Sequence, residues 1–210
     1  MTRMHLKALA MVSLLAGLPS FALAQTPQGA NPAKNAKSAK PGPAKGDARQ
    51  VPAAAVPTIG GAEPTLAGQF GSWGAYTATT GGKKVCFALA KPSSSKTNPP
   101  NRPRDPAYVF ISTRPAEKVA NEVSVMIGYQ LKPGSEGTLE IGGAKYAMYT
   151  QGDGLWIKNA AEEGQMVDAL KRGADVTVKG VSSRGTETTD VFSLKGLAQA
   201  LERVAQDCRR

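Results

Sequence analysis

Histidine is nearly absent from this sequence. The chain of 210 residues has one histidine, His5, which lies in a segment with the features of a signal peptide. Cleavage of that segment leaves the mature chain without an imidazole, the one side chain whose ordinary pKa lies near neutral pH. This absence excludes Ser–His–Asp triads, Cys–His nucleophile pairs and His-ligated metal sites.

Cysteine is also scarce, because the sequence contains two, Cys86 and Cys208. Their spacing excludes a Cys-x-x-Cys redox motif, and two cysteines without histidine do not make a zinc site. In an exported chain, a single pair of cysteines predicts one structural disulfide, Cys86–Cys208. The alternatives are a buried free thiol at Cys86 and a reactive thiol at Cys208.

Long apolar runs are missing beyond the N-terminus. Residues 1–24 begin with the basic residues Arg3 and Lys7, continue through an apolar stretch, and end in the small-residue pattern Ala22–Leu23–Ala24, as in a secretory signal peptide. We predict cleavage after Ala24 and a periplasmic or secreted location. A membrane anchor is the alternative, but the apolar stretch is shorter than the roughly 20 residues that span a bilayer. The mature chain is therefore predicted to have no transmembrane segment.

Large aliphatic residues are rare between residues 25 and 57, where Ala, Pro, Gly, Asn and Lys dominate. Such a composition predicts a disordered linker. Its lysines either hold the chain against an anionic surface or keep a soluble spacer extended. The net charge of +10 arises largely in the signal and linker, because residues 58–210 carry 19 basic and 15 acidic residues. Basic residues do not cluster with aromatic ones there, so no nucleic-acid partner is predicted.

Residues 58–210 are predicted to form one β-rich domain. Short alternating segments separated by Gly-rich turns predict strands, and helical spacing predicts a short helix at 162–171. A C-terminal helix is predicted to begin at Ser193, with Ala198 on its apolar face. Many short strands with regular turns predict an all-β sandwich or barrel. The predicted strands are 70–79, 85–90, 107–113, 122–129, 138–141, 145–149, 155–157, 174–181 and 188–192, and residues 91–105 are predicted to be a loop.

No motif predicts a catalytic centre. The segment Ser93–Ser94–Ser95–Lys96 has the Ser-x-x-Lys spacing of penicillin-recognising enzymes, but it lies in a predicted loop instead of at the start of a helix. Glu162 and Glu163 are adjacent at a helix start, where they favour the helix dipole. Asp153 lies between glycines without the spaced companions of a calcium loop, so it is interpreted as a turn residue. We predict no enzyme activity, no cofactor and no metal.

The aromatic residues belong either to the core or to a binding surface, and the alternating pattern assigns most of them to the core. Tyr149 and Trp156 are different because they flank a Gly-rich turn that contains Asp153. We therefore predict that Tyr149, Asp153 and Trp156 form a candidate binding surface.

Several short motifs resemble the invasion-associated locus B family. They are Phe70–Gly71–Ser72–Trp73, Cys86 in the following strand, Leu131–Lys132–Pro133–Gly134 before a strand, and the stretch 192–197 (FSLKGL) that leads into the last helix. Their order and spacing carry the resemblance, which covers nearly all of residues 66–208.

This resemblance implies an exported, envelope-associated protein with an immunoglobulin-like β-sandwich, a short inserted helix and a C-terminal helix. Founding members of the family are associated with host-cell invasion, and the family has no established catalytic residues. The expected function is therefore binding, with an envelope or host-surface protein or glycan as the partner. Two alternatives stay open. One is a periplasmic accessory or stress protein that binds an envelope protein or glycan, and the other is a glycan enzyme that uses only carboxylates.

Overall fold

The computed structural model describes residues 56–209. The predicted signal peptide (1–24) and the predicted linker (25–57), apart from its last two residues, lie outside the described residues. The described elements are β1 (Thr65–Phe70), β2 (Trp73–Thr80), β3 (Lys83–Ala90), β4 (Ser94–Asn98), β5 (Tyr108–Arg114), β6 (Val119–Met126), β7 (Glu136–Ile141), β8 (Ala144–Gln151), β9 (Gly154–Ile157), α1 (Glu163–Arg172), β10 (Asp175–Val181), β11 (Glu187–Ser193) and α2 (Leu197–Cys208).

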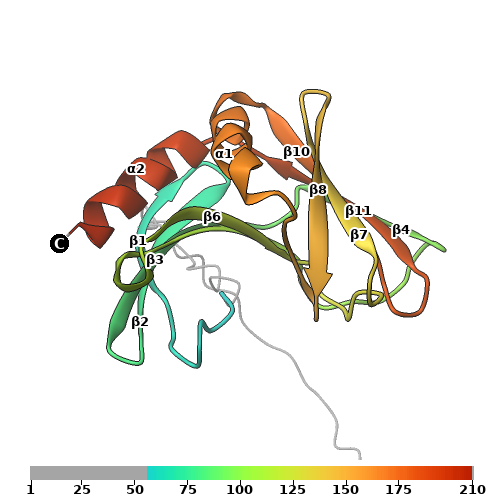
Figure 1. The fold of residues 1–210 in the computed structure, drawn as a ribbon, viewed down its shortest axis with the longest axis horizontal. Coiled ribbons are helices and arrows are strands. Elements are labelled where there is room, and N and C mark those ends of the chain that lie inside the picture. The colour runs from blue at the N-terminus through green and yellow to red at the C-terminus, as the bar shows by residue number, and fades with distance from the viewer. Residues whose placement is uncertain (1–55, 210) are drawn as a thin grey trace, which may run out of the picture. The chain divides into compact units, whose positions relative to one another are not determined.

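The strands form one antiparallel sheet in the order β1-β2-β3-β5-β6-β9-β8-β7-β10-β11-β4. The sheet bends between its two halves, so that β1, β2, β3, β5 and β6 enclose a common interior with β7 to β11 and β4 (Figure 1). One large hydrophobic cluster draws side chains from both halves, including Val109 and Ile111 of β5, Leu139 of β7 and Phe192 of β11. The expected all-β, sandwich-like fold is confirmed, with the difference that hydrogen bonding runs continuously from one half to the other.

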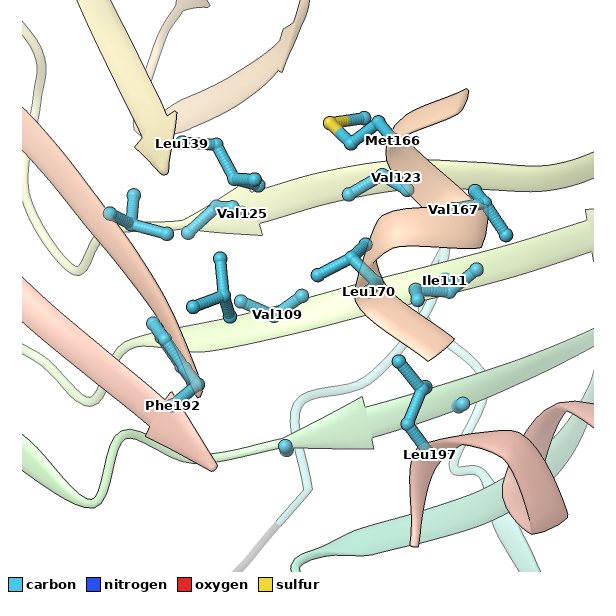
Figure 2. Packing of buried hydrophobic residues seen from close by; sticks show 14 of the residues in the cluster. Val109, Ile111, Val123, Val125, Leu139, Met166, Val167, Leu170, Phe192 and Leu197 are labelled. Atoms are coloured by element: carbon cyan, nitrogen blue, oxygen red, sulfur yellow. The ribbon is translucent and has the colours of Figure 1, made fainter. Parts of the chain in front are cut away.

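Two helices close this interior, as the sequence predicts. The first, α1, buries Met166, Val167 and Leu170, and Figure 2 shows these side chains directed toward Val123 and Ile111 of the sheet. The second, α2, packs on β1, β2 and β3 (Figure 1). Residues spaced three or four apart lie on one helix face, and the buried residues of α2 are Leu197, Ala200, Leu201 and Val204.

Strand β3 is covered on both of its faces. Successive side chains point to opposite sides of a strand, so Cys86 and Ala88 face the common interior whereas Phe87 and Leu89 face outward. We call the side of the sheet away from the common interior the outer face. Because both faces of β3 are covered, its sequence is an unbroken apolar run from Val85 to Ala90.

Three details differ from the sequence prediction. The strand predicted at 70–79 is β2, which begins at Trp73 after a turn at Gly71–Ser72, and the strand before that turn, β1, was not predicted. The predicted loop at 91–105 contains β4, which pairs with β11. The last helix begins at Leu197 instead of Ser193, and Ala198 is exposed. The cause of the later helix start is the extension of β11 through Ser193.

Candidate functional site

An aromatic pair lies on the outer face of the sheet, at β8 and β9. Tyr149 and Trp156 are directly opposite each other in these two antiparallel strands. Their ring centroids are 5.8 Å apart and the ring planes differ by 23°, which is a stacked arrangement. Tyr149 is 43% exposed, and Leu66 of β1 is the other large hydrophobic side chain that is exposed within residues 56–209. Two of the three residues predicted as a binding surface are thus brought together.

Gly154 explains how the tryptophan ring is placed. A Cβ atom at this position would come within 2.2 Å of Cη2 of Trp156, because side chains two residues apart lie on the same face of a strand. The ring therefore lies against the backbone of β9 instead of projecting from it. A glycine at position 154 is what allows this flat placement, since any side chain there would occupy the space of the ring.

Polar and charged side chains surround the aromatic pair. Glu136 lies opposite Tyr149 on the neighbouring strand β7, and it forms an ion pair with Lys158, just beyond β9. Glu140 and Lys145 form a second pair on the same strands, at 3.8 Å. These exposed pairs contribute little to stability. The Glu136–Lys158 pair gives the aromatic pair a frame of hydrogen-bonding groups, whereas Glu140 and Lys145 lie four residues further along β7 and β8. The arrangement suits a ligand that has both an apolar face and polar edges.

The same outer face carries a second aromatic cluster, which is covered. The rings of Tyr76 and Phe87 are 5.5 Å apart, and those of Phe87 and Phe110 are 5.7 Å apart. Phe87 is fully buried, and burial raises the pKa of Tyr76 and of Tyr108 above the usual value for a phenol. The apolar residues that pack on this cluster from the start of the described chain are Val56, Ile59 and Ala62.

Asp153 lies in the turn between β8 and β9, where its carbonyl oxygen accepts a hydrogen bond from Ile127 N at 3.0 Å. Asp153 lines a hollow with Asp105, Tyr108 and Met126 among others, and neither Tyr149 nor Trp156 lines that hollow. Its place supports the interpretation of Asp153 as a turn residue.

A buried ion pair between Arg104 and Asp190 was not predicted. The Asp190 side chain is fully buried and that of Arg104 is 11% exposed. Arg104 contacts both carboxylate oxygens, and it also donates to the carbonyl of Ile127 at 2.8 Å and to Ser95 Oγ at 3.0 Å. Pairing and hydrogen bonds are what a buried charge requires. The sequence feature that points to this pair is Asp190, an acidic residue at a position that alternates with Thr188 and Phe192 on the buried face of β11.

The predicted disulfide is present, since Cys86 and Cys208 are joined. It links the centre of β3 to the last residue of α2, so it fastens the C-terminal helix to the sheet. Cys86 is fully buried, and residues 56–209 contain no free cysteine. The alternatives of a buried free thiol and a reactive thiol therefore do not apply to this structure.

The weak catalytic motifs serve structural roles. Ser93 Oγ donates to the carbonyl of Val191 at 3.0 Å, and Lys96 lies in strand β4 instead of on a helix. Glu163 accepts a hydrogen bond from Val123 N at 2.9 Å and so ties α1 to β6. Over residues 56–209, no group of three or more Asp, Glu, His or Cys residues is placed to hold a metal ion. No helix in that part of the chain is long and apolar enough to cross a bilayer.

Two of the short motifs that carry the family resemblance meet in the structure. Gly71, at φ 55°, lies so close to Lys195 that a Cβ would come within 2.5 Å of its carbonyl oxygen, and Gly196, at φ 94°, approaches the carbonyl of Phe70 in the same way. Trp73 Nε1 donates to the carbonyl of Ser193 at 2.9 Å. Glycine is required at both contacts because the backbones touch and both φ values are positive.

The sequence also matches the family model described as invasion associated locus B (IalB) protein over residues 73–205, which is more than half of the chain. The chain belongs to the IalB family. No curated protein and no solved structure matches it. Within the segment that matches the IalB family lie Cys86 and the aromatic pair, whereas β1 and Cys208 lie just outside.

Proposed function

We propose that this IalB family chain is an exported, non-enzymatic envelope protein that binds a glycan of the envelope or of a host-cell surface through Tyr149 and Trp156. The observation that carries the proposal is the stacked aromatic pair on the outer face, in which Tyr149 is exposed and Trp156 is half-buried. Sugar rings have an apolar face of C–H groups and a rim of hydroxyls, which matches flat aromatic rings beside hydrogen-bonding side chains. The frame of Glu136 and Lys158 supplies such groups beside Tyr149.

Export is supported by two independent features. The sequence of residues 1–24 has the parts of a secretory signal, and the Cys86–Cys208 disulfide suits an oxidising compartment. Two further observations support a binding role. The family has no established catalytic residues, and the one histidine of the sequence lies in the predicted signal peptide.

Tryptophan fluorescence tests the binding site directly. The chain has two tryptophans, and Trp73 is fully buried, so a ligand on the aromatic pair changes mainly the emission of Trp156. The probes are muropeptides, lipopolysaccharide core oligosaccharides and sialylated host-cell glycans. We expect one of these classes to shift the emission and saturate.

Two substitutions, Tyr149→Ala and Trp156→Ala, should each weaken that binding by about tenfold or more, because aromatic anchors dominate small interfaces. Binding to Trp156→Ala is measured by calorimetry, because this variant lacks the fluorescent reporter. The matched control is Leu66→Ala, which removes the other exposed apolar side chain, and it should bind like the wild type. Unchanged affinity in both aromatic variants would show that the pair is not the site. If none of the three probe classes binds and a protein can be crosslinked to this face, the partner is a protein instead of a glycan.

Cell location decides between a host-facing and a periplasmic role. Intact producing cells are treated with protease, and the released peptides are identified by mass spectrometry beside a periplasmic control protein. Release of peptides from residues 56–153 while the control stays protected indicates host contact. Cleavage that needs an opened outer membrane indicates a periplasmic partner. Recovery of residues 1–24 still attached to the protein would contradict signal cleavage and favour the membrane-anchor alternative.

A further inference from the structure

A cationic cavity of about 370 Å³ lies beside the end of β4 and the turn between β10 and β11. Three segments line it: the end of β4 and the following loop, residues 129–130, and the turn between β10 and β11. None of its lining residues belongs to the aromatic pair, so the cavity is a second site. The lining residues are Thr97, Arg102, Pro103, Arg104, Tyr129, Gln130, Ser182, Ser183, Arg184 and Thr186.

Backbone and side-chain hydrogen bonds hold the three walls in place. Ser183 N donates to the carbonyl of Gln130 at 2.9 Å, which joins the turn to the second wall. Thr186 N donates to Ser182 Oγ at 2.9 Å, and Arg102 N donates to Thr97 Oγ1 at 3.1 Å. Both hydroxyls act as acceptors in these bonds, so each still has its own proton to donate into the cavity.

The charge of the cavity comes from two arginines. Arg104 is neutralised by the buried Asp190, whereas Arg102 and Arg184 form no side-chain ion pair or hydrogen bond with any residue of 56–209. No Asp or Glu lines the cavity. Along the chain, Asp105 directly follows Arg104 without lining the cavity, and Glu187 accepts a hydrogen bond from Asn98 Nδ2 at 3.1 Å. The cavity therefore has two guanidinium groups that form no ion pair within residues 56–209.

We propose that this cavity binds a phosphate monoester of a small polar molecule, with Arg102 and Arg184 on the phosphate and the hydroxyls of Thr97 and Ser182 as further donors. A monoester carries close to two negative charges at pH 7, which matches two free guanidiniums, and a single carboxylate would leave one of them unpaired. Arginine presents its donors in a planar fork that fits phosphate oxygens. A cavity of this size falls in the usual range for small-molecule sites. The phosphate belongs either to a soluble sugar phosphate or to the headgroup of a phosphorylated lipid.

The test is titration calorimetry of the purified protein with glucosamine 6-phosphate, and cosedimentation with vesicles that contain phosphatidic acid, a lipid phosphate monoester. Arg102→Gln and Arg184→Gln should each weaken binding by about tenfold or more. Both side chains are exposed, so we expect the variants to fold, and unchanged thermal midpoints verify this. The double variant K179Q/K195Q removes two positive charges, twice the change in either arginine variant, from exposed positions outside the cavity, and it should bind like the wild type.

Two further readouts separate the outcomes. Binding should weaken between pH 7 and pH 5, because the monoester takes up a proton near pH 6. Binding of the sugar phosphate indicates a soluble ligand, and binding of phosphatidic acid alone indicates a lipid headgroup; either result supports the proposal. Equal binding to phosphatidylglycerol vesicles, equal losses in K179Q/K195Q, or no binding of either probe at millimolar concentration would overturn it.

Discussion

The outer face of the sheet carries aromatic residues in two places that differ in their cover. On β2, β3 and β5, the rings of Tyr76, Phe87 and Phe110 lie beneath the segment that contains Ile59. On β8 and β9, Tyr149 and Trp156 stack without such a cover, and Tyr149 is 43% exposed. Both clusters use the same cross-strand stacking, so stacking alone does not tell a core from a surface.

The difference lies in what surrounds each cluster. Segment 56–62 folds back at Gly60–Gly61, where Ile59 and Ala62 bridge each other and Thr80 Oγ1 donates to the carbonyl of Ile59 at 3.1 Å. This contact keeps the cover on β2 and β3. The open pair instead has charged neighbours, Glu136 and Lys158, which a covering apolar segment would have to desolvate at a cost. The covered cluster is thus part of a core, whereas Tyr149 of the open pair stays accessible to solvent.

The largest change in stability is expected for loss of the disulfide on the inner face of β3, directly behind the covered cluster. C86A/C208A opens a loop of 122 residues, and on the chain-entropy account this lowers the free energy of unfolding by about 4 to 5 kcal/mol. Urea unfolding at pH 7 measures the loss relative to the oxidised wild type. The wild type in reducing agent, which also lacks the disulfide, should unfold like the variant. A change of under about 1 kcal/mol would show that α2 holds to β3 by packing alone.

Phe87→Ala tests the covered cluster itself. The fully buried ring leaves a cavity between β3 and the covering segment, so we expect a loss of about 3 to 4 kcal/mol. The same unfolding experiment on Leu66→Ala, at a position that is 53% exposed, should show a change within about 0.5 kcal/mol. A small loss for Phe87→Ala would mean that the covering segment does not form a core, and the contrast between the two clusters would fail.

Sequence patterns predict the elements whose burial follows a regular period. In β5 and β6, alternation places Val109 and Val123 inward, and in α1 helical spacing places Met166 and Leu170 against the sheet. The disulfide follows from two cysteines and a predicted export signal. The Gly-rich turn at Gly152–Asp153 brings β8 and β9 into the register that places Tyr149 opposite Trp156.

Features that depend on distant contacts could not be predicted in this way. Strand β4 (Ser94–Asn98) has no apolar alternation, because four of its five residues are exposed and its pairing depends on β11. The turn at Gly71 is set by the carbonyl of Lys195, which lies far along the chain. The partner of Asp190 lies in a Pro-rich loop, and the arginine cavity is assembled from three separate segments.

The open pair should contribute little to stability. Trp156→Phe is expected to change the free energy of unfolding by less than about 1 kcal/mol, since the position is partly exposed and an aromatic ring is kept. It leaves Trp73, which is fully buried, as the sole fluorophore of its kind. Quenching of the tryptophan fluorescence by acrylamide should therefore be severalfold weaker than in the wild type. A loss of about 3 kcal/mol or more would place Trp156 in the core and remove the contrast with the covered cluster.

The smallest effect is expected from alkaline pH. Burial raises the pKa of Tyr76 and Tyr108 above the ordinary value of 10.0, so the unfolded chain loses these protons at lower pH than the folded one. The stabilisation from keeping the phenols neutral is complete below pH 10 and is lost as the pH rises through the folded-state pKa. Each group contributes at most about 1.4 kcal/mol per pH unit to the slope of the free energy of unfolding against pH.

Urea unfolding from pH 8 to 11 measures this slope. Tyr76→Phe should reduce it, and Tyr149→Phe is the matched substitution in the open pair. An equal reduction in both variants would mean that the covering segment does not shield its tyrosines more than the open face does.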